Sequence, residues 1–441
     1  MRRRRPSRVA LISAVVILMA ACSGGSSRVT GSTISPADPP GWLTSRLGGD
    51  TTAKALRGRP FNQAARDLDN SELVRFGAGA DTFDEHRTVR DGLGPDFNDD
   101  GCLSCHLDGT KRTGPASTPP GMLVRISADG VPVAGYGLQL QTRSTTGRPE
   151  ATVTPRWITV HGHYPDGTTF TLRRPDTKIV TRTPLPDSVQ FSTRTAPLII
   201  GLGLLEAIPA ADLQAAADPN DSNHDGISGR VNVVADPNSP TGSAIGRFGW
   251  KASQPSVASQ TTTALREDMG VLSAPGPDGS PPEIDPDTLA DLIFYNRTIA
   301  VPIGRNTTSP TATRGAELFE KIGCAACHTP TQHSGPDAVA GLSDQTFHPY
   351  TDLLLHDMGP GLADGRPDGS ATGSEWRTAP LWGLGRRVEV TGRQSFLHDG
   401  RARTPTEAIL WHGGEASQAR TRFEHLSASD RAALAAFLNS L

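Results

Sequence analysis

Cysteine and methionine are scarce in this 441-residue chain, with five residues of each, and neither sign of charge dominates. Lysine and arginine total 43 against 46 aspartate and glutamate residues, which gives a formal net charge of −3. The lack of a basic excess argues against nucleic acid as a partner. The apolar run at residues 9–21 is too short to favour a helix that spans a membrane.

The N-terminus has the features of an export signal. Five arginines precede the apolar run, and Leu-Met-Ala-Ala-Cys at residues 18–22 resembles a bacterial lipoprotein cleavage site. Cys22 would then be the acylated first residue; a secretory peptide cut near Ala21 is the alternative. Removal of residues 1–21 takes away the five arginines and changes the formal net charge to −8. We therefore predict a signal peptide at 1–21 and a lipid-anchored flexible tether at 22–45. The folded part is expected outside the cytoplasm, in the periplasm or at the cell surface.

Four of the five cysteines lie in two copies of one motif. Residues 102–106 and 324–328 both read C-x-x-C-H, the pattern that attaches c-type haem. Two thiols form thioethers with the haem, and the histidine is the proximal iron ligand. A zinc site or a redox dithiol also uses C-x-x-C, but neither explains the histidine. We predict two haem c groups attached through Cys102, Cys105, Cys324 and Cys327, with His106 and His328 as proximal ligands.

Glycine and proline are abundant, with 47 and 36 residues, so we expect long loops and short regular elements. Apolar residues at helical spacing predict one helix over residues 313–322, ended by Gly323. A second helix is predicted over 426–441, with Ser427 or Ser429 as its N-cap. A helix before C-x-x-C-H and a helix at the terminus resemble the crossing pair of a class I cytochrome c domain.

Residues 121–183 follow a different pattern. Apolar and polar residues alternate there, which predicts strands, and a Pro-Asp-Gly-Thr turn at 165–168 separates two of them. His161 and His163 lie two apart in one strand, and we interpret them as surface residues rather than ligands. The predicted fold class is mainly α, with two cytochrome c-like haem domains, long loops and a β-rich insertion in the N-terminal domain. The predicted domains are an N-terminal catalytic haem domain at 46–300, with this insertion, and a C-terminal electron-transfer haem domain at 301–441.

The sequence Arg-Thr-Ala-Pro-Leu occurs twice, at 194–198 and 377–381, once after each haem motif. Six further motifs lie at residues 91–98, 202–208, 225–230, 350–359, 396–402 and 407–413. In these motifs the chain resembles bacterial di-haem oxidoreductases of a peroxidase family that is related to the di-haem cytochrome c peroxidases. The resemblance covers roughly residues 70–441.

The resemblance implies that the C-terminal haem is an electron relay with two axial ligands. His412 occupies the place of the distal methionine of the related peroxidases, so His328 and His412 are expected to form a bis-histidine pair. This pair would lower the potential of that haem, since two imidazoles favour ferric iron. Met358, His356 and His398 are the rivals of His412. One of the tryptophans 376, 382 and 411 is a candidate electron relay between the irons, although packing is the commoner role.

The His106 haem is the expected site of chemistry, because peroxide or oxygen needs an open or displaceable position on iron. Cleavage of an O–O bond also needs a general acid–base group. Glu206 is the candidate, since its apolar neighbours would raise its pKa; a capping or surface role is the alternative. Arg194 is the candidate for stabilising the developing charge.

Residues 218–230 resemble the first half of a calcium loop. Asp221, Asn223 and Asp225 are spaced two apart and Gly226 follows, but Asn232 replaces the glutamate expected at the twelfth position. Calcium is known in the related peroxidases, and a polar Asx-turn loop is the alternative.

Three functions remain. The first is a peroxidase that reduces hydrogen peroxide at the N-terminal haem, with electrons relayed by the C-terminal haem from a redox protein or a small donor. The second is a di-haem oxidase or oxygenase that acts on an organic or protein substrate. The third is a non-catalytic electron carrier in which both irons are six-coordinate.

Overall fold

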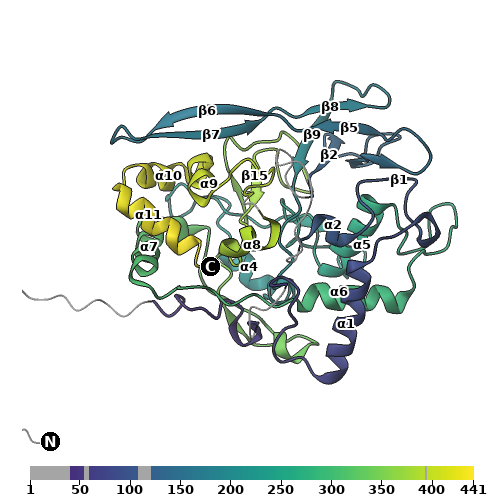
Figure 1. Ribbon diagram of the computed structural model, residues 1–441, viewed down its shortest axis with the longest axis horizontal. Coiled ribbons are helices and arrows are strands. Elements are labelled where there is room, and N and C mark those ends of the chain that lie inside the picture. Colours follow the sequence, from purple (N-terminus) through teal and green to yellow (C-terminus); the bar gives the residue numbers. More distant parts are fainter. Residues whose placement is uncertain (1–39, 54–58, 108–120, 393–394) are drawn as a thin grey trace, which may run out of the picture. The chain divides into compact units, whose positions relative to one another are not determined.

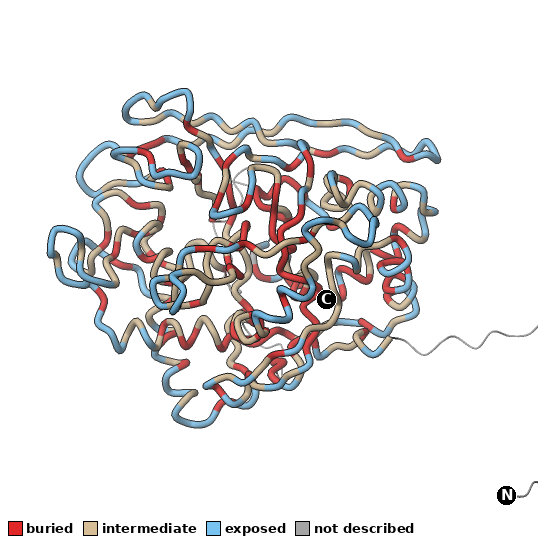
Figure 2. The backbone as a smooth tube through the Cα atoms, turned by 180° about the vertical axis from the view of Figure 1, so that it is seen from behind, coloured by how far each residue is buried: buried red, intermediate tan, exposed pale blue. Residues whose placement is uncertain are grey.

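The computed structural model describes residues 40–53, 59–107, 121–392 and 395–441. The predicted signal peptide and Cys22 lie outside the described residues. The described residues form one compact unit, built of helices and several small antiparallel sheets (Figure 1). Buried residues are concentrated in the middle of this unit and exposed ones at its edges (Figure 2). Within the described residues, no helix is both long and apolar enough to cross a bilayer.

Two helix pairs cross at glycines, one in each half of the unit. Helix α1 (Asn70–Asp84) packs on α6 (Pro286–Thr298), and α7 (Pro310–Lys321) packs on α11 (Ala428–Leu438). A Cβ on Gly79 would lie 2.1 Å from the Asp291 carbonyl oxygen, and one on Gly315 would lie 2.1 Å from that of Ala433. Only glycine permits this close approach of the helix backbones. The second pair is the one that the sequence predicts, and Ser427 caps α11 by accepting the Asp430 amide proton.

The region predicted as a β-rich insertion consists of strands. They pair as β3–β2–β9, β5–β8 and β6–β7, and the turn predicted at 165–168 joins β6 to β7. Both His161 and His163 are exposed, as expected. The strands are β2 (Leu123–Ala128), β3 (Gln139–Leu140), β4 (Arg143–Ser144), β5 (Ala151–Thr154), β6 (Trp157–His163), β7 (Thr169–Pro175), β8 (Lys178–Thr181) and β9 (Val189–Arg194).

The β6–β7 hairpin lies over the C-terminal helices α9 and α10 (Figure 1). Arg173 donates to the carbonyl oxygens of Gly400 and Arg401, and Arg431 of α11 pairs with Asp166 in the hairpin turn. The hairpin therefore ties the N-terminal half of the sequence to the C-terminal half.

The remaining elements are short and join these parts. The helices are α2 (Cys102–Cys105), α3 (Leu202–Glu206), α4 (Ala210–Ala216), α5 (Val257–Met269), α8 (Arg387–Thr391), α9 (Pro405–Trp411) and α10 (Ser417–Glu424). The strands are β1 (Asp96–Phe97), β10 (Val233–Ala235), β11 (Ser243–Ile245), β12 (Gln332–His333), β13 (Thr346–Phe347), β14 (Leu355–Asp357) and β15 (Glu375–Arg377). The 3-10 turns are η1 (Gly49–Thr51), η2 (Val89–Asp91), η3 (Cys324–Ala326), η4 (Ala340–Leu342), η5 (Leu384–Arg386) and η6 (Gly414–Ala416).

The predicted tether is too long at its C-terminal end. Residues 40–45 are packed rather than free: Leu43 is buried, and the Trp42 ring contacts Tyr350 and Phe437 edge to face. The Tyr350 hydroxyl also donates to the Trp42 carbonyl oxygen. Apolar contacts with the C-terminal half hold these residues, so a tether could only comprise residues before 40, which lie outside the description.

Candidate functional site

The two C-x-x-C-H motifs form similar turns. In the first, the His106 amide donates to the Cys102 carbonyl oxygen at 2.9 Å; in the second, the His328 amide donates to that of Cys324 at 3.0 Å. None of their four cysteines is in a disulfide. Each motif therefore presents two thiols and one imidazole from a single turn.

Three histidines share one hydrogen-bonding pattern. The Nδ1 atom donates to a backbone carbonyl oxygen: Pro197 for His106 at 3.0 Å, Tyr350 for His328 at 3.0 Å, and Ala408 for His412 at 2.7 Å. Burial lowers the pKa of all three imidazoles, that of His328 to about 4, so the rings are neutral. A donating Nδ1 leaves the Nε2 lone pair free, which is the form of histidine that binds a metal.

His328 and His412 face each other. Their ring centroids are 6.5 Å apart. Two metal–imidazole bonds of about 2.0 Å, with about 1.1 Å more from each Nε2 to its ring centre, would put the centroids about 6.2 Å apart. The pair is thus spaced to hold one iron between the two rings.

A large cavity of about 420 Å³ surrounds this pair. Its volume is within the range of cofactor pockets, about 300–1,000 Å³. The two histidines, Cys324 and Cys327 lie in its wall, together with many apolar side chains. These residues fit a haem, because thiols for attachment, two axial nitrogens and an apolar lining meet in one cavity.

A small cavity of about 30 Å³ lies at the first motif. His106 and Cys105 line it, and the other described lining residues include neither a second histidine nor a methionine. Residues 108–120 and 393–394 lie outside the described residues. Cys102, Cys105 and His106 offer two thiols for attachment and one nitrogen for iron, which is the donor set of the C-x-x-C-H motif.

The two cavities adjoin. Pro197, Leu198 and Arg387 line both of them. Trp250, which no sequence motif marked, contacts residues of both walls. Its Nε1 donates to the carbonyl oxygen of Thr195, which lines the small cavity. Its carbonyl oxygen accepts the amide proton of Arg377, which lines the large cavity. Of the tryptophans proposed from sequence, 376 and 382 line the large cavity and 411 does not.

A family model described as "di-haem oxidoreductase, putative peroxidase" matches residues 160–282 and 276–441, which is more than half of the chain. The chain belongs to this di-haem oxidoreductase family. Haem is therefore the cofactor of the protein, and its activity is that of an oxidoreductase. The resemblance seen in the sequence motifs is confirmed.

Solved structures are only distantly similar to this di-haem oxidoreductase. Hydrazine synthase of Kuenenia stuttgartiensis is 15% identical, with 96% of this chain and 100% of that chain covered and a TM-score of 0.37. The dihaem peroxidase BthA of Burkholderia thailandensis is 15% identical, and the match covers 89% of this chain and 91% of that chain with a TM-score of 0.39. A MauG-like protein associated with microbial copper homeostasis is 17% identical, and the match covers 55% of this chain and 89% of that chain with a TM-score of 0.27. No curated protein matches the sequence.

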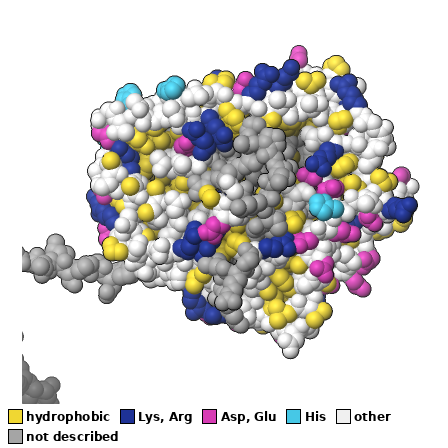
Figure 3. All heavy atoms as spheres, in the orientation of Figure 1, with side chains coloured by type: hydrophobic (Ala, Val, Ile, Leu, Met, Phe, Trp, Pro, Cys, Tyr) yellow, Lys and Arg dark blue, Asp and Glu magenta, His cyan; other side chains and the backbone are white. Residues whose placement is uncertain are grey.

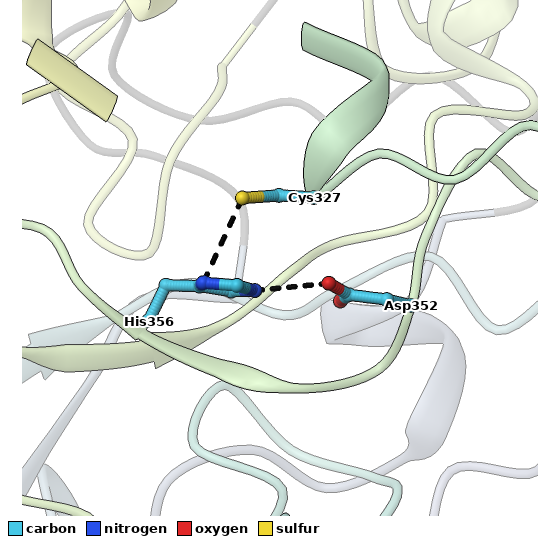
Figure 4. A group of neighbouring side chains, drawn as sticks. All are labelled: Cys327, Asp352 and His356. Atoms are coloured by element: carbon cyan, nitrogen blue, oxygen red, sulfur yellow. Dashed lines mark hydrogen bonds and ion pairs between the residues drawn. The ribbon is translucent and has the colours of Figure 1, made fainter. Parts of the chain in front are cut away.

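His356, a rival ligand, is engaged at both ring nitrogens (Figure 4). Its Nε2 contacts Asp352 at 2.9 Å and its Nδ1 contacts Glu415 at 2.7 Å, with the Cys327 sulfur 3.6 Å from Nδ1. Burial alone would lower the pKa of His356, but the hydrogen bonds, that with Asp352 foremost, raise it to about 12. A charged imidazole between two carboxylates has no lone pair for iron. The cluster of Cys327, Asp352 and His356 is also no free metal site, because Cys327 belongs to the haem motif.

The other rivals line the large cavity. His398 stacks on Trp376 with ring centroids 3.7 Å apart and planes at 6°, and burial lowers its pKa to about 4. Met358 is half-buried in the same wall. Neither has the facing arrangement of His412 and His328.

Glu206 is tied into the fold. Its carboxylate pairs with Arg297 and accepts the Val257 amide proton at 2.7 Å, at the first turn of α5. Arg297 in turn pairs with Asp337. Glu206 lines neither cavity, so its acid–base role stays a prediction, and the geometry gives it a capping and ion-pairing role.

Arg194 is buried in an ion-pair network. It contacts Asp368 at 2.7 Å, Asp364 at 3.5 Å and the Ser192 hydroxyl at 2.9 Å, and its guanidinium lies 5.5 Å from the Trp376 ring centroid. It is not among the residues that line the cavities. Its predicted catalytic role therefore also stays a prediction.

The loop at residues 218–230 is held by Asx turns. Asp221 accepts the amide protons of Asp225 and Gly226, and Asn223 accepts that of Asp225. Asp225 accepts the amide proton of Ile227 and the side-chain proton of Asn223. These hydrogen bonds are those of the Asx-turn alternative, and a carboxylate oxygen that accepts an amide proton keeps a lone pair for a metal, so calcium binding stays a prediction.

Proposed function

We propose that this di-haem oxidoreductase is a c-type peroxidase that reduces hydrogen peroxide at the His106 haem. Cys102 and Cys105 would attach that haem, and Cys324 and Cys327 the second one. His328 and His412 would ligate the second iron from both sides, and this haem would relay electrons to the first.

One observation supports the proposal: the described residues around the two C-x-x-C-H motifs differ. Two facing imidazoles are built into the large cavity, whereas the described wall of the small cavity offers only His106. A six-coordinate iron transfers electrons without binding substrate, and an iron with one protein ligand can bind peroxide. In this proposal the haem at His328 and His412 would transfer electrons, and the haem at His106 would react with peroxide.

Haem held by the two motifs would supply electron transfer and, at His106, an iron for the reaction with peroxide. The chain supplies orientation and exclusion of water. The carbonyl oxygens of Pro197, Tyr350 and Ala408 hold the Nδ1 atoms of the three histidine rings, which leaves Nε2 as the nitrogen that would bind iron. Trp250 is hydrogen-bonded to residues of both cavity walls, and it would be the residue for electron passage.

The proposal includes the surroundings of the protein. We propose export as a lipoprotein through Cys22, so that the protein is anchored to the membrane outside the cytoplasm. Its electrons would come from a redox protein or a small donor. Acidic and basic side chains are mixed over the face shown in Figure 3, in line with the absence of nucleic acid among the proposed partners.

Electron paramagnetic resonance of the purified ferric protein tests the proposal. We expect one high-spin iron and one low-spin bis-imidazole iron, and oxidation of a reduced electron donor when hydrogen peroxide is added. Two low-spin irons that ignore peroxide would contradict it and favour the electron carrier. A high-spin iron that consumes oxygen with an organic or protein substrate, but not peroxide, would favour the oxidase or oxygenase.

A further inference from the structure

Arg377 is a buried arginine in the wall of the large cavity. Only 8% of its surface is exposed. Its Nε donates to the Gly249 carbonyl oxygen at 3.0 Å and its Nη1 approaches that of Thr378 at 3.4 Å. In the part of the chain that the structure describes, no carboxylate lies within ion-pair distance of it. Burial of a guanidinium is costly unless an anion compensates its charge.

The repeated Arg-Thr-Ala-Pro-Leu sequence provides an internal comparison. Arg194, the first residue of the other copy, is paired with Asp364 and Asp368 and lines no cavity. Arg377, at the same position of the second copy, has carbonyl partners and lines the cavity. Asp352 is the carboxylate whose charge acts on Arg377, but its carboxylate is paired with His356 instead. Among the described residues, Arg377 therefore has no ion-pair partner, and its guanidinium is available to an anion in the cavity.

We propose that the Arg377 guanidinium binds a propionate carboxylate of the haem in the large cavity. This inference rests on the proposed function, which puts a haem there. A haem carries two propionates, and the planar guanidinium forms paired hydrogen bonds with a carboxylate. The same positive charge favours ferrous iron, which has one positive charge less than ferric iron, so Arg377 would raise the midpoint potential of this haem.

A buried arginine that lines no cavity serves as the control. Arg247 is also 8% exposed, and its Nη1 donates to the Leu205 carbonyl oxygen at 3.2 Å. It has the same side chain, burial and type of partner as Arg377, but it is absent from both cavity walls. Arg247→Gln therefore removes a buried charge without touching the proposed contact.

The test is potentiometry of the full-length haem-loaded protein, followed by optical and paramagnetic resonance spectra. In Arg377→Gln, the oxidation equilibrium of the low-spin haem should shift about tenfold toward ferric, about 59 mV for one electron. In Arg247→Gln, the midpoint potential of the same haem should change by less than a third of that shift. Equal potentials in the two variants would overturn the inference. The haem content of the wild type distinguishes a failure of the proposed function from a failure of the Arg377 inference. A protein without haem in the large cavity would overturn both. Equal potentials of the two variants in a protein with two haems would overturn only the Arg377 inference.

Two further measurements test the contact between Arg377 and the propionate directly. Arg377→Lys keeps the positive charge but loses the planar guanidinium, and it provides a test if Arg377→Gln does not fold. The propionate bending band in its resonance Raman spectrum should differ from that of the wild type. An unchanged band would contradict the inference. Sodium formate tests whether Arg377 binds a free carboxylate instead. We expect no effect of formate on the wild-type potential, and a saturable shift would overturn the assignment to propionate.

Discussion

The imidazole rings of His328 and His412 face each other with centroids 6.5 Å apart and planes inclined by 43°. The first ring comes from the second haem motif, and the second follows α9 more than eighty residues later. Both are fixed from behind by Nδ1 hydrogen bonds to the backbone. A spacing that matches two metal–nitrogen bonds arises here from two independent backbone anchors.

His412→Met should raise the midpoint potential of the low-spin haem. Methionine favours ferrous iron more than imidazole does, so the shift should be tenfold or more in the oxidation equilibrium, at least about 59 mV. Redox titration with paramagnetic resonance measures it. His425→Met is the matched control, because the exposed His425 makes the same i−4 bond from Nδ1, to the Thr421 carbonyl oxygen at 2.8 Å. The same potential in both variants would exclude His412 as the ligand.

The cysteine pairs should each hold one haem. Replacement of Cys324 and Cys327 by serine should remove one of two covalently held haems and, with it, the low-spin signal. Replacement of Cys102 and Cys105 should instead remove the high-spin signal. Haem staining of the denatured protein counts the attached groups, and the spectra assign the loss. Full staining of either double variant would show that its motif does not attach haem.

Local patterns predicted the parts of the site that depend on neighbours in sequence. The C-x-x-C-H turns, helix α7 and the Ser427 cap all follow from spacing within a few residues. No motif marked Trp250, and the repeat that contains Arg377 did not reveal its place at the cavity, since both positions depend on contacts between distant segments.

The acid–base role predicted for Glu206 rests on its apolar neighbours alone. Those neighbours are buried in the core, but Arg297, 91 residues away, meets the carboxylate. A pattern of hydrophobic residues cannot reveal such a charged partner. The acidic loop at 218–230 is similar in one respect, because the amide protons that its carboxylates accept are seen only in the structure, and calcium binding stays a prediction.

Glu206→Ala should lower stability more than it lowers peroxidase turnover. The substitution removes the ion pair with Arg297 and the acceptor for the Val257 amide, and leaves Arg297 with Asp337 alone, so we expect a loss of about 1–3 kcal/mol. Denaturant unfolding measures it. Glu206→Gln, which keeps an acceptor for Val257, should lose less. A large fall in kcat with unchanged stability would restore Glu206 as the acid–base group.

The network around Asp368 should make the fold sensitive to acid. Burial alone would raise the pKa of Asp368, but Arg194 and Arg366 outweigh it and hold the pKa well below its usual range. Lys251 and Arg194 likewise lower the pKa of Asp364 against its burial. A depressed carboxyl pKa contributes stability that is present above the unfolded pKa, about 4, and is lost as the pH falls through the folded value.

The melting temperature of the wild type should therefore fall steeply as the pH is lowered below about 4. Asp368→Asn should lose about 3–5 kcal/mol near pH 6, because it leaves buried cations without their partner, and its melting temperature should change less between pH 5 and pH 3. Asp176→Asn is the control, since Asp176 is exposed. Scanning calorimetry across this range decides the matter. Parallel curves for all three proteins would mean that acid acts elsewhere in the fold, whereas a flattened curve for Asp368→Asn alone would locate the acid-sensitive step in the ion pairs that join β9 to the segment before β15.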